Sequence, residues 1–294
     1  MNPRKRLKEL FARQRLLLAP GAFDGLSARL VEEAGFEAVY LSGGSVARST
    51  GVPDIGLMTM SEVIERAQQV VAAVAIPVIA DADTGYGNAL NLVRTVHEFE
   101  RAGVAAIHIE DQVTPKRCGH LEGKEVISLP EMEKKLEAAL ASRADPDFAI
   151  IGRTDARAIF GLEDAIERAK TFARLGVDAV FIEAPESQAE LETIARSIRE
   201  IPLMVNMFKG GKTPLLPASR LEEMGFRIAI FPSDTQRAAI HAMKEALALL
   251  KREGSTAAMD ERLATFQERD RVVGLGDWQR LEELYLKGAG DKKK

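Results

Sequence analysis

The sequence predicts a (β/α)8 barrel of parallel strands, followed by extra C-terminal helices. One observation is a near-repeat of a charged helical stretch, a glycine and a short apolar run, seen in "EEAGFEAVYLSG", "ERAGVAAIHIED", "ARLGVDAVFIEA" and "EEMGFRIAIFPS". A second is that the apolar runs are continuous, which is typical of strands that are covered on both faces. A third is the length of 294 residues, which suits a single barrel.

Eight apolar runs give the strands in order. The glycine in each near-repeat fits the left-handed position that ends a helix. The runs "RLLLAPGAFD", "AIPVIADAD", "DFAIIGRTD" and "EIPLMVNM" supply the other four strands. The expected strands lie at about 16–20, 36–42, 76–82, 105–111, 148–154, 178–184, 202–207 and 226–232. Eight such units favour a closed barrel, and a doubly wound open sheet is the alternative.

Segments with helical periodicity separate these strands. Two of the expected helices are Met60–Val74 and Leu162–Leu175. Ser128 and Glu131 form a capping-box pattern, which predicts that another helix starts near Leu129.

The chain continues beyond the eighth strand with more helix than a minimal barrel uses. Helices are expected at about 235–252 and 256–270, and a segment with Trp278 follows them. We expect a single barrel domain over residues 1–294, with a helical extension from about 235. The tail from about 288, "GAGDKKK", has nothing to bury and is expected to be disordered.

The bulk composition excludes several classes of partner. The net charge is −4, from 44 acidic and 40 basic residues, so nothing favours binding to nucleic acid or to an anionic membrane. The longest apolar run, near Val70–Ala80, contains Pro77 and is too short to span a bilayer. The single cysteine excludes an intrachain disulfide framework and fits a reducing compartment. A soluble cytoplasmic protein is expected.

Unusual polar residues fall at the carboxyl ends of the expected strands. In a barrel these ends converge on one face, where active sites are found. Convergence from seven strands therefore predicts an active site there, although a single such residue could be a turn former. In chain order the residues are Ser42, Asp81, Asp83, Glu110, Asp111, Arg153, Asp155, Glu183, Asn206, Ser233 and Asp234.

Asp81 and Asp83 are candidate metal ligands. Two carboxylates at the end of one strand repel each other unless a cation or a proton lies between them. No His pair or Cys cluster is nearby, so an all-oxygen site for Mg²⁺ or Mn²⁺ is expected. Asp54 and Glu110 would hold metal-bound waters. The alternative is a turn in which the Asp side chains cap backbone amides.

Two further features could hold a substrate carboxylate. The adjacent glycines Gly43 and Gly44, after Ser42, allow backbone N–H groups to face an anion, although a tight turn explains them equally well. Arg153 follows directly from an apolar strand, and a buried Arg needs an anionic partner. That partner could be a substrate carboxylate, or Glu183 or Asp155 in an internal salt bridge.

Cys118 is the only cysteine, and it lies beside Lys116 and Arg117 with His120 two residues on. Its loop, at about 112–127, is long for a barrel connection, which is typical of a lid or a binding loop. Gly119 and Gly123 give hinge points. A reactive or proton-donating thiol is therefore favoured over a small buried hydrophobe.

Taken together, these motifs resemble the isocitrate lyase and phosphoenolpyruvate mutase superfamily over about Leu18 to Arg237. The matching motifs are "KRCGH" (Lys116–His120), "DADTGYG" (Asp81–Gly87), "LSGG" (Leu41–Gly44), "PDIG" (Pro53–Gly56), "HIEDQ" (His108–Gln112) and "GRTDA" (Gly152–Ala156). The resemblance implies a Mg²⁺-dependent barrel, usually a homotetramer whose C-terminal helices swap between subunits. The loop cysteine is similar to that of the carbon–carbon lyases of the superfamily, and the chain looks most like the methylisocitrate lyases.

The resemblance also implies an activity, a retro-aldol-type cleavage of a 2-hydroxy di- or tricarboxylate. The main expectation is cleavage of 2-methylisocitrate to pyruvate and succinate. Cleavage of 2,3-dimethylmalate or of another 2-hydroxydicarboxylate is an alternative. A phosphonomutase or oxaloacetate decarboxylase on the same scaffold is another, and a non-catalytic carboxylate-binding protein is a fourth.

The motifs carry roles over to individual residues. Cys118 would donate the proton that quenches the carbanion, with Lys116 and His120 as the other catalytic residues. Mg²⁺ held near Asp81 and Asp83 would stabilise the oxyanion that becomes pyruvate. The residues implied in substrate binding are Tyr40, Ser42, Gly43, Gly44, Gly119, Arg153, Glu183, Asn206 and Arg237.

Overall fold

The computed structural model describes residues 2–286. Its contacts divide the chain into two compact units, one up to Arg237 and one from Ala238 onward. The grouping of all residues into one domain stays a prediction. The tail that is expected to be disordered lies outside the described residues.

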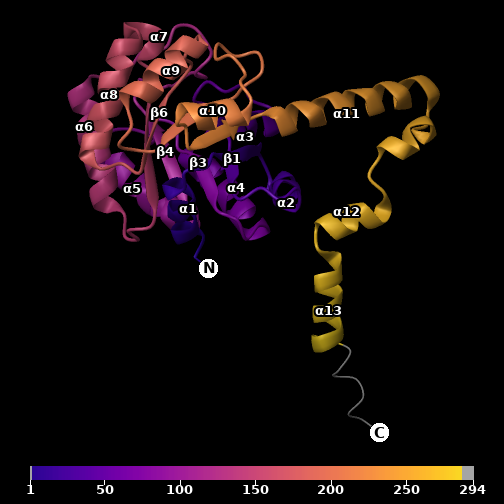
Figure 1. Cartoon of the computed structure of the whole chain (residues 1–294). Coiled ribbons are helices and arrows are strands. Elements are labelled where there is room, and N and C mark those ends of the chain that lie inside the picture. The colour runs from indigo at the N-terminus through magenta and orange to yellow at the C-terminus, as the bar shows by residue number, and fades with distance from the viewer. Residues whose placement is uncertain (1, 287–294) are drawn as a thin grey trace. The chain divides into compact units, whose positions relative to one another are not determined.

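The first unit is a closed barrel of eight parallel strands surrounded by helices (Figure 1). The ring closes where β1 pairs with β8, with Leu17 opposite Ile228 and Pro20 opposite Phe231. This closure confirms the predicted barrel and excludes the open sheet. The strands are β1 (Leu17–Ala22), β2 (Val39–Leu41), β3 (Val78–Asp81), β4 (Ala106–Glu110), β5 (Ala149–Thr154), β6 (Ala179–Ile182), β7 (Leu203–Asn206) and β8 (Ile228–Phe231).

Helices connect the strands and begin where the sequence offers caps. The Ser128 side chain accepts from the Glu131 amide, so α6 starts at Leu129 as predicted. The helix predicted at Leu162–Leu175 has these bounds. The helices that begin in the first unit are α1 (Pro3–Ala12), α2 (Gly25–Glu33), α3 (Gly43–Ser49), α4 (Met60–Ala73), α5 (Ala89–Arg101), α6 (Leu129–Ser142), α7 (Arg157–Phe160), α8 (Leu162–Leu175), α9 (Gln188–Ser197), α10 (Ala218–Met224) and α11 (Asp234–Glu253).

Apolar side chains fill both sides of the sheet. The inward-facing residues of the strands, among them Ile228 and Ile230, form one buried cluster with Leu7, Leu10 and Phe11 of α1. A second, larger cluster lies between the strands and the surrounding helices. The barrel interior is therefore packed, and polar groups are left for the carboxyl ends of the strands.

The second unit contains three short helical elements: a 3₁₀ helix (Ala257–Arg262), α12 (Phe266–Val272) and α13 (Leu275–Tyr285). The single helix predicted at about 256–270 is wrong. Thr265 has an extended backbone, and its side chain accepts from the Glu268 amide, so a new helix starts there.

Large apolar side chains remain exposed along α11 and through the second unit. The described chain has no helix long and apolar enough to cross a membrane. A series of large exposed apolar side chains of this kind is typical of an interaction surface. The exposed residues are Ile240, Met243, Leu247, Leu250, Leu263, Phe266, Val273, Leu275, Trp278, Leu281, Leu284, Tyr285 and Leu286.

Candidate active site

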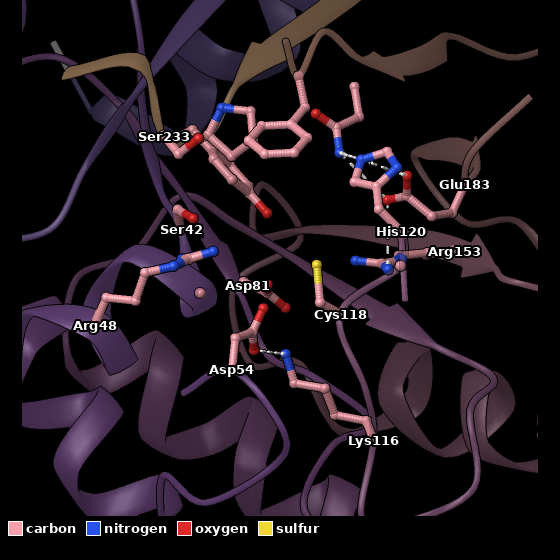
Figure 2. Close-up of a pocket in the computed structure, with 16 residues that line it drawn as sticks. Ser42, Arg48, Asp54, Asp81, Lys116, Cys118, His120, Arg153, Glu183 and Ser233 are labelled. Atoms are coloured by element: carbon pink, nitrogen blue, oxygen red, sulfur yellow. Dashed lines mark hydrogen bonds and ion pairs between the residues drawn. The ribbon is translucent and has the colours of Figure 1, made fainter. Parts of the chain in front are cut away.

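A cavity opens at the carboxyl ends of the barrel strands, and most of the predicted site residues line it (Figure 2). Strands β2 to β8 deliver polar residues at or near their carboxyl ends, because the apolar runs before them pack the barrel. The predicted residues that line the cavity are Tyr40, Ser42, Gly44, Asp54, Asp81, Lys116, Cys118, Gly119, His120, Arg153, Glu183, Asn206 and Ser233.

Three predicted residues lie just outside this cavity. Gly43 and Asp83 line a small adjoining cavity, together with Asp54, Asp81 and Lys116. Glu110, at the end of β4, is buried behind Arg153, and one of its oxygens contacts the Arg153 Nη1 at 3.1 Å.

The acidic wall of the site is built around Lys116. Its ammonium group donates to Asp54 Oδ1 and lies 2.9 Å from Asp83 Oδ1. Asp81 is buried, and its Oδ1 accepts from the Asp83 amide at 3.0 Å. The predicted turn role of Asp81 is therefore present, and its Oδ2 stays available to another partner.

The two aspartates of this wall differ in their affinity for protons. Burial raises the pKa of Asp83 to about 6, although Lys116 acts in the opposite direction. Burial also acts to raise the pKa of Asp81, but His108, Lys116 and Arg153 outweigh it and hold it at about 2. Burial lowers the pKa of His108 to about 4, so this ring is uncharged at neutral pH. Lys116 and Arg153 are then the charges that lower the pKa of Asp81.

This wall fits a hard divalent cation that keeps part of its water shell. Glu110 Oε1 is buried without a hydrogen-bond partner, and Asp83 Oδ1 is buried with the Lys116 ammonium as its only charged contact in the described residues. Within residues 2–286, no three His, Cys, Asp or Glu side chains are grouped closely enough to hold an ion by themselves. The adjoining cavity has a volume of about 10 Å³, which is roughly the room that one water molecule needs. Mg²⁺ usually binds one or two protein carboxylates and keeps water molecules as its remaining ligands.

Glycines let these carboxylates approach the backbone closely. A Cβ atom on Gly43 would lie 2.8 Å from Asp81 Oδ2, and one on Gly44 would lie 2.6 Å from Asp54 Oδ2. Neither contact leaves room for a side chain. The predicted Ser-Gly-Gly turn is the first turn of α3, and Ser42 caps it by accepting from the Ser45 amide at 3.3 Å.

The opposite wall is centred on Arg153. Its guanidinium lies 3.1 Å from Glu110, 3.0 Å from Asp155 and 3.3 Å from Glu183, and it stacks over the Phe181 ring. Of the two predicted roles, the structure contains the internal salt bridge. These three carboxylates outweigh burial and raise the pKa of Arg153, so it remains charged.

Tyr40 forms the floor between the two walls. Its hydroxyl lies 2.7 Å from His108 Nε2, and the two rings stack with their centroids 5.7 Å apart. Burial raises the pKa of Tyr40 well above its usual value, so the phenol stays neutral. It can therefore take part in hydrogen bonds in the cavity without adding charge.

The loop between β4 and α6 is fastened to the barrel at two places. Near its base, the Gln112 side chain accepts from the Arg117 amide and donates to the Arg117 carbonyl. Near its tip, buried Lys124 donates to the Gly119 carbonyl and lies 3.1 Å from Asp155. This second fastening was not predicted, because a lysine in a polar loop gives no sign of its burial.

Cys118 is half-buried and faces the cavity from this loop (Figure 2). Burial, followed by the charge of Asp54, raises the pKa of the thiol. Lys116 is engaged by carboxylates, and Arg117 is exposed outside the cavity. The thiol therefore keeps its proton at neutral pH, which suits a proton donor better than a nucleophile.

His120 is held against the wall that contains Glu183. Its ring stacks on Phe208 at 5.1 Å, its Nδ1 accepts from the Lys212 amide, and its Nε2 lies 3.7 Å from Glu183 Oε1. Burial lowers the pKa of His120, so the ring is neutral at pH 7. Asn206 at the end of β7 lies 3.4 Å from the same Nε2.

Arg237 is the predicted substrate contact that the structure places elsewhere. Its guanidinium donates to the Lys209 carbonyl and lies over the Phe208 ring, and the residue does not line the cavity. Arg48, Phe208 and Pro232 line it instead, and no role was predicted for them. Arg48 could have been found from the sequence, because it lies four residues after Gly44 and so shares its helix face.

Known proteins resemble this chain in sequence and in structure. A family model described as phosphoenolpyruvate phosphomutase matches residues 7–251. The 2,3-dimethylmalate lyase of Eubacterium barkeri is 43% identical, over 98% of this chain and 100% of that protein. A probable 2-methylisocitrate lyase of Corynebacterium glutamicum is 44% identical, over 92% of this chain and 88% of that protein.

Solved structures extend the likeness to three dimensions. A structure of 2,3-dimethylmalate lyase has a TM-score of 0.92 and 36% identity, over 99% of this chain and 98% of that one. A structure of oxaloacetate acetylhydrolase with 3,3-difluorooxalacetate also has a TM-score of 0.92, with 34% identity over 100% and 99% of the two chains. The chain thus belongs to the phosphoenolpyruvate mutase/isocitrate lyase superfamily.

Proposed function

We propose that the protein is a Mg²⁺-dependent carbon–carbon lyase that cleaves a 2-hydroxy di- or tricarboxylate to pyruvate and a second carboxylic acid. The observation that carries this proposal is the protonated Cys118 thiol, which faces a cavity whose other wall holds Asp81 beside Asp83. A thiol that keeps its proton can quench a carbanion, and the carboxylate pair can hold the cation that an oxyanion needs.

The cleavage can be followed through the residues of this chain. The 2-hydroxy-carboxylate end of the substrate would lie at Asp81 and Asp83, where bound Mg²⁺ would stabilise the developing oxyanion. The substrate hydroxyl group would lose its proton to a carboxylate of the acidic wall, and the carbon–carbon bond breaks as the C–O bond becomes the ketone of pyruvate. The electron pair stays on the departing carbon, next to its carboxylate, and this carbanion takes the proton of Cys118 Sγ.

The neighbouring residues keep the site ready for this proton transfer. Lys116 offsets one of the two negative charges of Asp54 and Asp83, which reduces the repulsion between this acidic wall and an anionic substrate. Neutral His120 lies beside Glu183, and because its Nδ1 accepts from the Lys212 amide, its Nε2–H can donate a hydrogen bond to the second product. Arg153 holds Glu110 and Glu183 in place and supplies positive charge at the substrate.

The proposed substrate is 2-methylisocitrate, which would give pyruvate and succinate. Several relatives are named 2-methylisocitrate lyase, including the Bacillus subtilis protein, which is 39% identical over 96% of this chain. The second candidate is 2,3-dimethylmalate, because the relative with that name matches over its full length. Cys118 supports either substrate over a phosphonomutase reaction, because phosphoryl transfer leaves no carbanion that needs a proton. A decarboxylase would also have to protonate an enolate, so carbon dioxide in the product analysis distinguishes it.

The assembly is proposed to be a homotetramer in which α11 and the second unit pack on neighbouring subunits. The thirteen exposed apolar residues of this part of the chain are what such an interface would cover. A cytoplasmic location is proposed as well, because the only cysteine is a free thiol, which fits a reducing compartment.

A coupled pyruvate assay tests the proposed function. The purified protein is given a panel that includes 2-methylisocitrate, 2,3-dimethylmalate, oxaloacetate and phosphonopyruvate, with Mg²⁺ or after exhaustive chelation. We expect stoichiometric pyruvate and a second acid from one of the first two, only with the metal. Carbon dioxide or phosphate as the main product would refute the lyase, and full turnover after chelation would refute the metal requirement.

A further inference from the structure

Arg48 is a cavity-lining residue with no assigned role. It lies in the last turn of α3, four residues after Gly44, and its side chain runs back toward the cavity (Figure 2). A Cβ atom on Gly44 would lie 2.9 Å from Arg48 Nη1. The glycine therefore leaves the space that the guanidinium occupies at the edge of the cavity.

The other cations of the cavity are already bound to carboxylates. Lys116 contacts Asp54 and Asp83, and the three carboxylates around Arg153 surround its guanidinium. His120 is neutral at pH 7, because burial lowers its pKa. Among residues 2–286, the Arg48 side chain takes part in no hydrogen bond or ion pair, so its charge is available to an anion that enters.

The depth of the two ends of the cavity indicates which anionic group of a substrate Arg48 would meet. Asp81 is 6% exposed and Asp83 is 8% exposed, so the hydroxy-acid end of the substrate lies deep. Arg48 is an exposed residue that lines the cavity, whereas Asp81 and Asp83 are buried, so we place Arg48 nearer to solvent than the two aspartates. A carboxylate at the far end of the substrate would be the group that meets it.

We infer that Arg48 binds the carboxylate of the substrate that lies away from the hydroxyl group, and so selects di- and tricarboxylates over monocarboxylates. The inference rests on the proposed function for the placement of the hydroxy-acid end. An arginine suits the role because its planar guanidinium can donate two parallel hydrogen bonds to one carboxylate.

The competing explanation is a solvated arginine that only complements the C-terminal end of α3. A cation in the last turn of a helix is weakly stabilising by itself. Such a residue would affect the thermal midpoint but not the choice between two ligands. Ligand choice is therefore the readout that separates the two explanations.

The test is calorimetric binding of malate and of 2-hydroxybutyrate in the presence of Mg²⁺. Both ligands contain the 2-hydroxy acid group. Malate carries a second carboxylate at the position where 2-hydroxybutyrate carries a methyl group. The variants are Arg48→Gln and Arg48→Lys. Arg101→Gln is the matched control, because Arg101 is also exposed in the last turn of a helix but does not line the cavity.

Wild-type protein is expected to bind malate more tightly than 2-hydroxybutyrate. Arg48→Gln should weaken malate binding about 10- to 100-fold, which is the range for loss of a hydrogen bond to a charged group. The same substitution should change the affinity for 2-hydroxybutyrate by less than about twofold. Arg48→Lys should restore part of the malate affinity, and Arg101→Gln should match wild type. Unchanged malate affinity, an equal loss for both ligands, or no malate binding to wild type would overturn the inference.

This binding test is independent of turnover. If the panel yields no pyruvate while Arg48→Gln still loses malate selectively, the proposed lyase reaction fails and the role of Arg48 stands. If pyruvate is formed and the selective loss is absent, the reaction stands and the role of Arg48 fails.

Discussion

Cys118 lies close to acidic groups, and its burial keeps it in the thiol form. Asp54 and Glu183 both act to raise its pKa, and the cationic neighbour Lys116 only partly opposes them. From the sequence alone, two basic residues before a cysteine are compatible with a reactive thiol or with a proton donor. The structure favours the proton donor because Lys116 is turned to the aspartates and Arg117 is exposed.

Replacement of Cys118 by Ser should remove turnover without unfolding the protein. We expect kcat to fall by about 10²- to 10⁴-fold, the usual contribution of a general acid, because a hydroxyl is a much weaker acid than a thiol. The thermal midpoint should stay close to that of wild type. The kcat and the thermal midpoint are measured on one preparation to separate a catalytic role of Cys118 from a packing role. A normal kcat with a lowered midpoint would show a packing role.

The raised pKa of Cys118 can be measured directly, because the chain has one cysteine. Alkylation requires the thiolate, so the rate rises as pH passes upward through the pKa. The half-maximal rate with iodoacetamide should therefore lie above the usual pKa of about 8.5. Mass spectrometry follows the adduct, with Cys118→Ala as the blank. Half-maximal labelling below neutral pH would contradict the proton-donor role.

At the scale of elements, the cysteine loop depends on Lys124. This lysine contacts both the Gly119 carbonyl and Asp155 at the end of β5, so one buried ammonium group connects the loop tip to the barrel. Close packing adds to this fastening. A Cβ atom on Gly119 would lie 2.5 Å from Glu183 Cγ and 2.8 Å from Arg153 Nη2, which only a glycine avoids.

Lys124→Met should loosen this loop while the barrel stays folded. Loss of hydrogen bonds from a charged donor costs about 1.5–3 kcal/mol each, so we expect kcat/KM to fall about tenfold or more. Hydrogen exchange of residues 116–125 should accelerate. Lys134→Met is the matched control, because the Lys134 side chain is 74% exposed and its ion pair contributes little. Unchanged exchange in Lys124→Met would show that packing alone holds the loop.

The elements of the barrel were largely predictable, whereas parts of the site were not. Apolar runs that end in polar residues predict the strands, because burial on both faces of a sheet leaves a clear pattern. For Arg153 the sequence offered Glu183 and Asp155 as partners beside a substrate carboxylate, and both contacts are present. The third partner, Glu110, was not predicted, since it comes from the neighbouring strand β4. The position of Arg237 also depends on a tertiary contact, the Lys209 carbonyl, that no local pattern encodes.

For the molecule as a whole, the exposed apolar residues after the barrel predict association. Light scattering at micromolar concentration should give a mass near four times 32.1 kDa. Trp278→Asp and Leu284→Asp should lower it, because the side chains are 68% and 65% exposed in the single chain. Glu282→Gln serves as a neighbouring control. A wild-type mass of one chain would contradict the tetramer.

Helix α1 has a kinetic consequence. With Leu7, Leu10 and Phe11 packed against the filled interior, the cavity communicates with solvent only at the end where the cysteine loop lies. Both products must then leave by one exit, and the acid nearer to that exit leaves before the pyruvate at Asp81 and Asp83. Pyruvate should therefore inhibit competitively against substrate and the second acid non-competitively. The opposite inhibition pattern would mean that the deeper product departs first.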